Sequence, residues 1–111
     1  ISRKKLSGFV DSLGYEVVAE ACDGLEAIEK YKEYEPEYVL TDLEMPNMKG
    51  DETAKNILSL NSNVNIILIT SIVDKKELVN ALKIGVKKIM QKPVTLQKVQ
   101  VAIEELAQRK E

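Results

Sequence analysis

Hydrophobic and polar positions along the chain alternate between a helical and a strand-like period. Apolar residues recur at helical spacing from Leu6 to Leu13, and Gly14 ends this stretch, which predicts a first helix. Tyr15–Ala21 then alternates polar and apolar residues. This alternation indicates a strand at the edge of a sheet, with one face buried and the other in water.

Capping signals predict where the later helices begin. Asp23 and Glu26 have the spacing of a capping box and open a helix that ends near Pro36. Asp74–Glu77 forms a second capping box, and Gly85 ends the helix that follows it. The two remaining predicted helices contain Ala54, Ile57 and Leu58, and, after a cap at Thr95, Leu96, Val99, Ile103 and Leu106.

Three further segments read as strands: Tyr38–Asp42, Ile66–Thr70 and Val86–Lys92. The first two are nearly all apolar, so we expect them in the middle of a sheet, while the more polar third segment suits an edge. Single helices separate the strands, which predicts right-handed crossovers and a parallel sheet of the α/β class. A loop over residues 43–50 follows the first of these strands.

The composition argues against several functional classes of protein. The chain has 111 residues, 44% of them hydrophobic, which fits one domain with one core. A net charge of −2 argues against direct nucleic-acid binding, and no apolar run approaches the roughly 20 residues that span a bilayer. The single Cys22 cannot form an internal disulfide, so we expect a reducing, cytoplasmic location. Because the chain has no histidine, its chemistry must use carboxylates, hydroxyls and lysines.

Asp42, Thr70 and Lys92 each end a predicted strand, and parallel strands end at the same edge of a sheet. A carboxylate at this edge can act as a nucleophile and form an acyl phosphate, while an ammonium and a hydroxyl group compensate the added charge. One polar residue at a strand end usually marks only a loop boundary. The three together, with Pro46 and Gly50 after the aspartate, indicate a phosphoryl-accepting site.

Four stretches carry a resemblance to a known family: residues 15–27, 38–50, 66–71 and 85–93. With Asp42-Leu-Glu-Met-Pro…Gly50, Thr70-Ser71 and Lys92-Pro93, the chain resembles the receiver domain of two-component response regulators, whose simplest member is the single-domain chemotaxis regulator. The resemblance covers essentially all of residues 1–111. It implies a flavodoxin-like, doubly wound parallel sheet with strand order 2-1-3-4-5.

The resemblance also implies roles for individual residues. Asp42 would accept a phosphoryl group from the phosphohistidine of a sensor histidine kinase or a phosphotransfer protein. Thr70 and Lys92 would bind the phosphoryl oxygens. Mg²⁺ would be bound by the Asp42 carboxylate and the backbone carbonyl of Glu44, and the Lys92–Pro93 bond would be cis.

Two positions around this site differ from the usual family pattern. Ile89 stands where many members have an aromatic residue that moves inward when the threonine, here Thr70, engages phosphate. We therefore assign the switch to Thr70 and Ile89, without an aromatic ring. Glu44 adds a carboxylate beside the pocket, and we hypothesise that its charge alters the lifetime of the phosphoryl group.

The family's first strand, which ends in an acidic pair that holds Mg²⁺, has no counterpart in the chain. Ser2–Leu6 already corresponds to the start of the first helix. The strand should lie between Tyr15–Ala21 and Tyr38–Asp42, and each unpaired buried main-chain group there would cost about 1–3 kcal/mol of the roughly 5–15 kcal/mol that stabilise a domain. We expect an N-terminal segment, a strand of about 5–6 residues plus its loop, to supply it. The alternative is a truncated or swapped form in which another chain supplies the strand.

Three functional hypotheses follow. The first is a phosphorylation-controlled switch, not a classical enzyme, that acts through a downstream target, its own output domain, or a homodimer. The second is a pseudo-receiver, an interaction module independent of phosphorylation, which only the missing acidic pair supports. The third, a nucleotide-binding enzyme, is weak because neither Gly-x-Gly-x-x-Gly nor Gly-x-x-x-x-Gly-Lys-[Ser/Thr] occurs.

Overall fold

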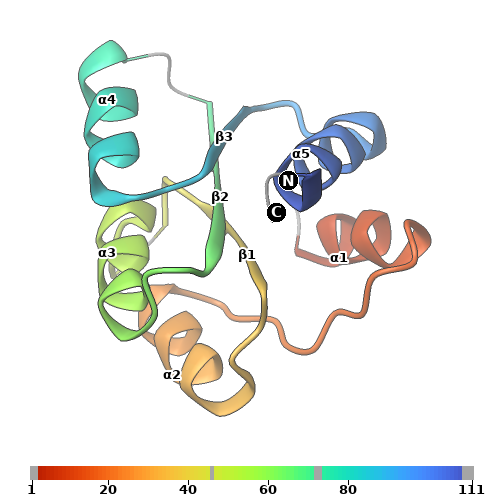
Figure 1. Cartoon of the computed structure of the whole chain (residues 1–111), viewed down its shortest axis with the longest axis horizontal. Coiled ribbons are helices and arrows are strands. Elements are labelled where there is room, and N and C mark those ends of the chain that lie inside the picture. The colour runs from red at the N-terminus through yellow and green to blue at the C-terminus, as the bar shows by residue number, and fades with distance from the viewer. Residues whose placement is uncertain (1–2, 46, 72–73, 109–111) are drawn as a thin grey trace.

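Helices and strands alternate along most of the chain. The structure, a computed structural model, describes residues 3–45, 47–71 and 74–108. Figure 1 shows the helices packed around a central sheet. The elements are α1 (Arg3–Ser12), α2 (Gly24–Tyr34), β1 (Tyr38–Asp42), α3 (Gly50–Leu60), β2 (Asn65–Thr70), α4 (Lys75–Ile84), β3 (Lys88–Gln91) and α5 (Leu96–Gln108).

The sheet in the described residues has three parallel strands in the order β1-β2-β3. Opposite β2, Asp42 of β1 faces Ile69, and Gln91 of β3 faces Thr70. The apolar strand β2 is buried along nearly all of its length and pairs on both edges, as the sequence predicts. The α/β class and the parallel sheet are therefore confirmed.

Alternate residues of β2 divide the core into two layers. Ile66 and Leu68 pack on one face against residues of α2, α3 and α4, and Ile67 and Ile69 pack on the other against α5 and α1. Figure 1 shows these two groups of helices on opposite sides of the sheet. This period-2 division is what a strand buried on both faces requires.

The predicted helix starts agree with the structure. Asp23 caps α2 by accepting a hydrogen bond from the Glu26 N–H at 2.9 Å, and the Glu26 carboxylate in turn accepts from the Cys22 N–H. Thr95 accepts from the Lys98 N–H at the start of α5, and Asp74 from the Lys76 N–H at the start of α4. These side chains satisfy N–H groups that the first turn of a helix leaves without partners.

The predicted edge strand over residues 15–21 is wrong. This segment has no strand pairing, although Val17, Ala19 and Ala21 are half-buried and the residues between them are exposed. The alternation thus predicted which side chains turn inward, but a strand also needs a neighbour for its main-chain hydrogen bonds. Cavities, not a strand, separate residues 15–23 from β1 in the described structure.

No helix in the described part of the chain combines the length and the apolar character that crossing a membrane requires.

The core packing generates a first prediction. Ile57 of α3 is 0% exposed, whereas Leu60 of the same helix is 50% exposed. Ile57→Ala should lower the free energy of unfolding by about 2–5 kcal/mol, because it removes buried methyl groups and leaves a cavity. Leu60→Ala should change it by about 0.5 kcal/mol or less. Urea unfolding measures both, and equal losses in the two variants would contradict this layering of the core.

Candidate functional site

Asp42 and Lys92 meet at the carboxyl end of the sheet. Asp42 is the last residue of β1, and Lys92 follows the last residue of β3. The Lys92 Nζ lies 2.9 Å from Asp42 Oδ2, and each side chain is about one-quarter exposed, at 26% and 25%. The structure therefore brings together two of the predicted site residues, as an ion pair with access to solvent.

Thr70 ends β2 at the same edge. It is 1% exposed, and its main-chain carbonyl accepts a hydrogen bond from the Lys92 N–H at 2.8 Å. Its position places its side chain on the face of β2 that carries Ile66 and Leu68. Ile89 packs against that same layer, opposite Leu68. The two predicted switch residues thus share one face of the sheet.

Gly50 fixes the loop that follows Asp42. The loop returns to the sheet, where the Gly50 N–H donates to the Leu43 carbonyl at 3.0 Å and α3 begins. A Cβ atom on Gly50 would lie 2.3 Å from the Asp42 carbonyl oxygen and 2.8 Å from Leu43 Cα. Only glycine allows this approach, so Gly50 keeps α3 in contact with the main chain of Asp42.

Lys98 holds the segment that carries Lys92. Its Nζ donates to the carbonyl oxygens of Gln91 at 3.0 Å and Pro93 at 2.9 Å, on either side of Lys92. The Lys92–Pro93 peptide bond is cis. No sequence pattern predicts this role, because a lysine in the first turn of an amphipathic helix is normally a solvated residue.

Glu44 connects the ends of β1 and β2. Its Oε1 accepts hydrogen bonds from the Ser71 N–H at 3.0 Å and from the Ser71 Oγ–H at 2.6 Å. Desolvation raises the pKa of the Glu44 carboxyl, but the Ser71 donors, its own N–H and the Lys92 ammonium outweigh this effect and lower the pKa to about 2. Glu44 is therefore ionised at neutral pH. Sequence reasoning included Ser71 in the family motif but did not identify it as a partner of Glu44.

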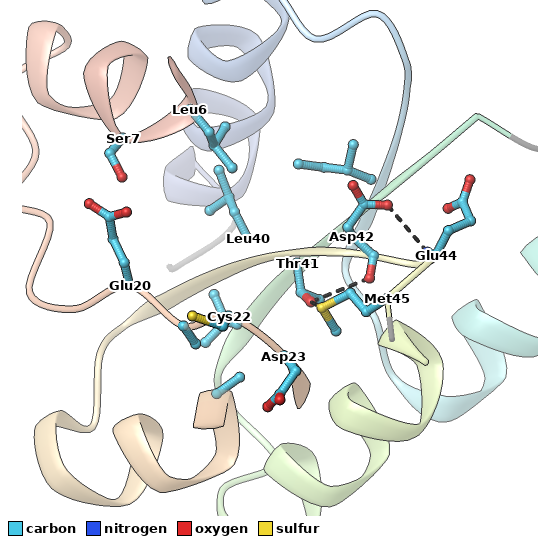
Figure 2. Close-up of a pocket in the computed structure, with 14 residues that line it drawn as sticks. Leu6, Ser7, Glu20, Cys22, Asp23, Leu40, Thr41, Asp42, Glu44 and Met45 are labelled. Carbon is cyan, nitrogen blue, oxygen red and sulfur yellow. Dashed lines mark hydrogen bonds between the residues drawn. The ribbon is translucent and has the colours of Figure 1, made fainter. Parts of the chain in front are cut away.

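Two neighbouring cavities of about 300 and 580 Å³ follow the outer edge of β1. The smaller one is lined by Asp42, Leu40 and Asp23, and Figure 2 shows these side chains around it. The larger one continues from Leu40 to Tyr38, and the two share lining residues of α1. Together they form an elongated groove between β1 and residues 15–23, which we call the β1 groove.

The main chain of β1 indicates what the β1 groove can accept. The Glu37 carbonyl accepts from the Asn65 N–H, and the Leu43 N–H donates to the Ile69 carbonyl. These odd-numbered positions therefore face β2. Because main-chain groups alternate between the two edges of a strand, those of Leu40 and Asp42 face the groove. The groove thus has the geometry of a sheet edge.

The site offers oxygen ligands for a metal ion. The Asp42 carboxylate lines the β1 groove, and the Glu44 main chain lies next to it, since its N–H donates to Asp42 Oδ1 at 3.2 Å. Asp23 also lines the groove, but one of its oxygens caps α2 and the other accepts from Asn47 Nδ2 at 3.0 Å. Among the described residues, no three His, Cys, Asp or Glu side chains gather to hold a metal. One carboxylate and one carbonyl suit Mg²⁺ in kind and need further oxygen ligands.

This arrangement suits group transfer to Asp42. A partly exposed carboxylate lies against an ammonium group, with a buried hydroxyl residue on the adjacent strand. Such a carboxylate can attack an electrophile, and the ammonium can offset the charge that develops.

Comparisons with known proteins agree with this fold. The family model of the response regulator receiver domain matches residues 1–104. The chain is 37% identical over 91 residues to a chemotaxis protein CheY of Thermotoga maritima, covering 82% of this chain and 76% of that protein. It is 34% identical over 105 residues to a chemotaxis protein CheY of Listeria monocytogenes, covering 95% and 88%.

Solved structures show the same relationship. A chain of the CheX-CheY-BeF3-Mg+2 complex from Borrelia burgdorferi superposes with a TM-score of 0.89 at 29% identity, covering 94% of this chain and 79% of that chain. A receiver domain protein from Clostridium thermocellum gives a TM-score of 0.88 at 26% identity, covering 96% and 86%. The chain belongs to the response regulator receiver domain family. It has the CheY-like α/β fold and belongs to the signalling domains of two-component systems, not to a class of conventional enzymes.

The tight approach at Gly50 generates a second prediction. Gly50→Ala should lower the free energy of unfolding by about 1–3 kcal/mol, because its Cβ would overlap main-chain atoms of Asp42 and Leu43. Gly8 of α1 is the matched control, since a Cβ there meets nothing within 4 Å. Gly8→Ala should raise the stability by about 0.5–1 kcal/mol through its helix propensity. An unchanged or raised urea midpoint in Gly50→Ala would show that Gly50 has no such role.

Proposed function

We propose that the chain is a phosphorylation-controlled switch in which Asp42 is the phosphoacceptor. The observation that carries this proposal is the 2.9 Å ion pair between Asp42 and Lys92 at the carboxyl edge of the sheet, beside the buried Thr70. An ion pair with a purely structural role would not explain why β2 also ends at this edge of the sheet with a buried threonine, Thr70. Membership of the receiver family supports the same assignment.

In the proposed reaction, a carboxylate oxygen of Asp42 attacks the phosphorus atom of a phosphohistidine on a sensor histidine kinase or a phosphotransfer protein. The new O–P bond forms as the P–N bond of the donor breaks, and the electron pair stays on the imidazole nitrogen. The Lys92 ammonium then leaves the carboxylate and pairs with a phosphoryl oxygen, and the Thr70 hydroxyl donates a hydrogen bond to another phosphoryl oxygen. The product is an acyl phosphate on Asp42.

We assign Mg²⁺ binding to the Asp42 carboxylate and the Glu44 main-chain carbonyl. When bound, the ion supplies positive charge to the transferring phosphoryl group. The solved complex of the Borrelia burgdorferi CheY contains Mg²⁺ and BeF3, which supports a metal site in this family.

The further metal ligands fit on a strand in the β1 groove. A strand running parallel to β1 there would end beside Asp42 and complete the family order 2-1-3-4-5, with residues 15–21 as its outer neighbour. Leu6 and Ser7 of α1 line both cavities of the groove, and Val10 lines only the larger one.

The proposed signal to other proteins depends on Thr70 and Ile89, which lie on the same face of the sheet. Movement of Thr70 toward a phosphoryl group would leave space on the face where Ile89 packs. Ile89 can fill this space and transmit the change to α4 and β3. We propose that a downstream protein, an attached output domain or a second copy reads this change in the cytoplasm.

A pseudo-receiver is the second candidate. The observation in its favour is that the described residues provide no group of three acidic side chains at the site. This module would use the same fold for binding, without phosphorylation.

Mass spectrometry of the full-length protein with Mg²⁺ and acetyl phosphate separates the two candidates. The switch requires the gain of one phosphoryl group, its loss in Asp42→Ala, and its retention in the control Asp51→Ala, which removes a carboxylate from the first turn of α3. A protein that folds but gains no phosphoryl group under these conditions would be a pseudo-receiver. A gain that persists in Asp42→Ala would place the acceptor elsewhere.

A further inference from the structure

The contact between Glu44 and Ser71 joins two loops that start from different strands. Glu44 lies two residues after the end of β1, and Ser71 is the first residue after β2. One oxygen of Glu44 accepts from both polar hydrogens of Ser71, the main-chain N–H and the hydroxyl group. Both residues are exposed, so this contact is not a requirement of the core.

The same contact belongs to a closed set of interactions around the phosphoacceptor. The Glu44 N–H donates to Asp42 Oδ1, and Asp42 Oδ2 pairs with Lys92. The Lys92 N–H donates to the carbonyl of Thr70, the residue before Ser71. Glu44 therefore closes a ring that passes through all three proposed site residues. Figure 2 shows the carboxylates of Asp42 and Glu44 on the same side of the chain at the end of β1.

A phosphoryl group on Asp42 would change the charge balance of this ring. In the structure, the Lys92 ammonium pairs with the Asp42 carboxylate, and the Glu44 carboxylate lies on the Ser71 donors. A phosphoryl group adds negative charge and three acceptor oxygens, which need donors close to Asp42. The N–H and hydroxyl of Ser71 are donors at this edge of the sheet, and Glu44 already occupies them. Glu44 and the phosphoryl group are therefore competitors for Ser71.

We propose that Glu44 is a latch for the unphosphorylated state: its carboxylate holds Ser71 until a phosphoryl group on Asp42 displaces it. The proposal rests on the proposed function, because it requires that Asp42 is phosphorylated. Glu44 is a positioning residue here, acting through Ser71. The latch sets how easily Ser71 leaves its resting position, and hence the balance between the two states.

The main test compares Glu44→Gln with the wild-type full-length protein. Glutamine keeps the size of the side chain and removes its charge. The ratio of the phosphorylation to the dephosphorylation rate constant, measured with Mg²⁺ and acetyl phosphate, should rise about two- to tenfold, the range that the net contribution of one hydrogen bond gives. Glu29→Gln is the matched control, because it removes the same charge from an exposed position on α2 and should leave the ratio unchanged.

Two further measurements separate the latch from a general charge effect. In ¹⁵N NMR spectra without phosphodonor, the Ser71 amide should exchange with solvent faster in Glu44→Gln than in the wild type, while Glu29→Gln should not affect it. In a Ser71→Ala background, which removes the hydroxyl donor, the effect of Glu44→Gln on the rate ratio should be smaller. Coupling of this kind requires that the two side chains act on each other.

The outcomes for the two proposals differ. If wild type and Glu44→Gln are phosphorylated with the same rate ratio, the latch is wrong and the switch stands, whatever the Ser71 amide shows. A raised ratio that is the same with and without the Ser71 hydroxyl, and that leaves the Ser71 amide unchanged, also overturns the latch. If neither protein accepts a phosphoryl group, the proposed function fails and the latch fails with it.

Discussion

The parallel pairing of β2 with both of its neighbours is the constraint on which the site depends. Parallel strands run in one direction, so their carboxyl ends meet at one edge, and the register of the ladders decides which residues arrive there together. With Asp42 opposite Ile69 and Gln91 opposite Thr70, Asp42, Thr70 and Lys92 reach the edge on three successive levels of the sheet. Because a shift by one residue would turn every side chain to the other face, burial of β2 on both faces also secures the site.

The loops at this edge hold the side chains and main-chain groups that the strands bring together. Gly50 lets α3 approach the main chain of Asp42, and Lys98 holds the carbonyl groups on both sides of Lys92. Glu44 ties the end of β1 to the segment after β2. Asp42, held in this way, has an ammonium within reach and keeps one side open to the β1 groove.

The successes and the failure of the sequence predictions have the same physical origin. Strands β1 and β2 and the helix starts at Asp23, Asp74 and Thr95 depend on local patterns, and the structure agrees with all of them. The third strand is shorter than Val86–Lys92, at Lys88–Gln91. The strand over residues 15–21 was wrong, because its pattern describes only side-chain burial. The main-chain pairing of a strand depends on what lies beside it.

The sequence by itself determined the order of the helices and of strands β1 to β3, the family, and the presence of Asp42, Thr70 and Lys92 at three strand ends. These features follow from hydrophobic period, capping residues and parallel topology, each of which acts over a few residues or through the crossover rule. Only the tertiary structure decided the 2.9 Å Asp42–Lys92 pair, the hold of Glu44 on Ser71, and the role of Lys98. Those contacts join atoms from segments that lie far apart in the chain or on opposite sides of a loop. Strand register and loop conformation therefore determine them, and no local sequence pattern encodes the register or the loop conformation.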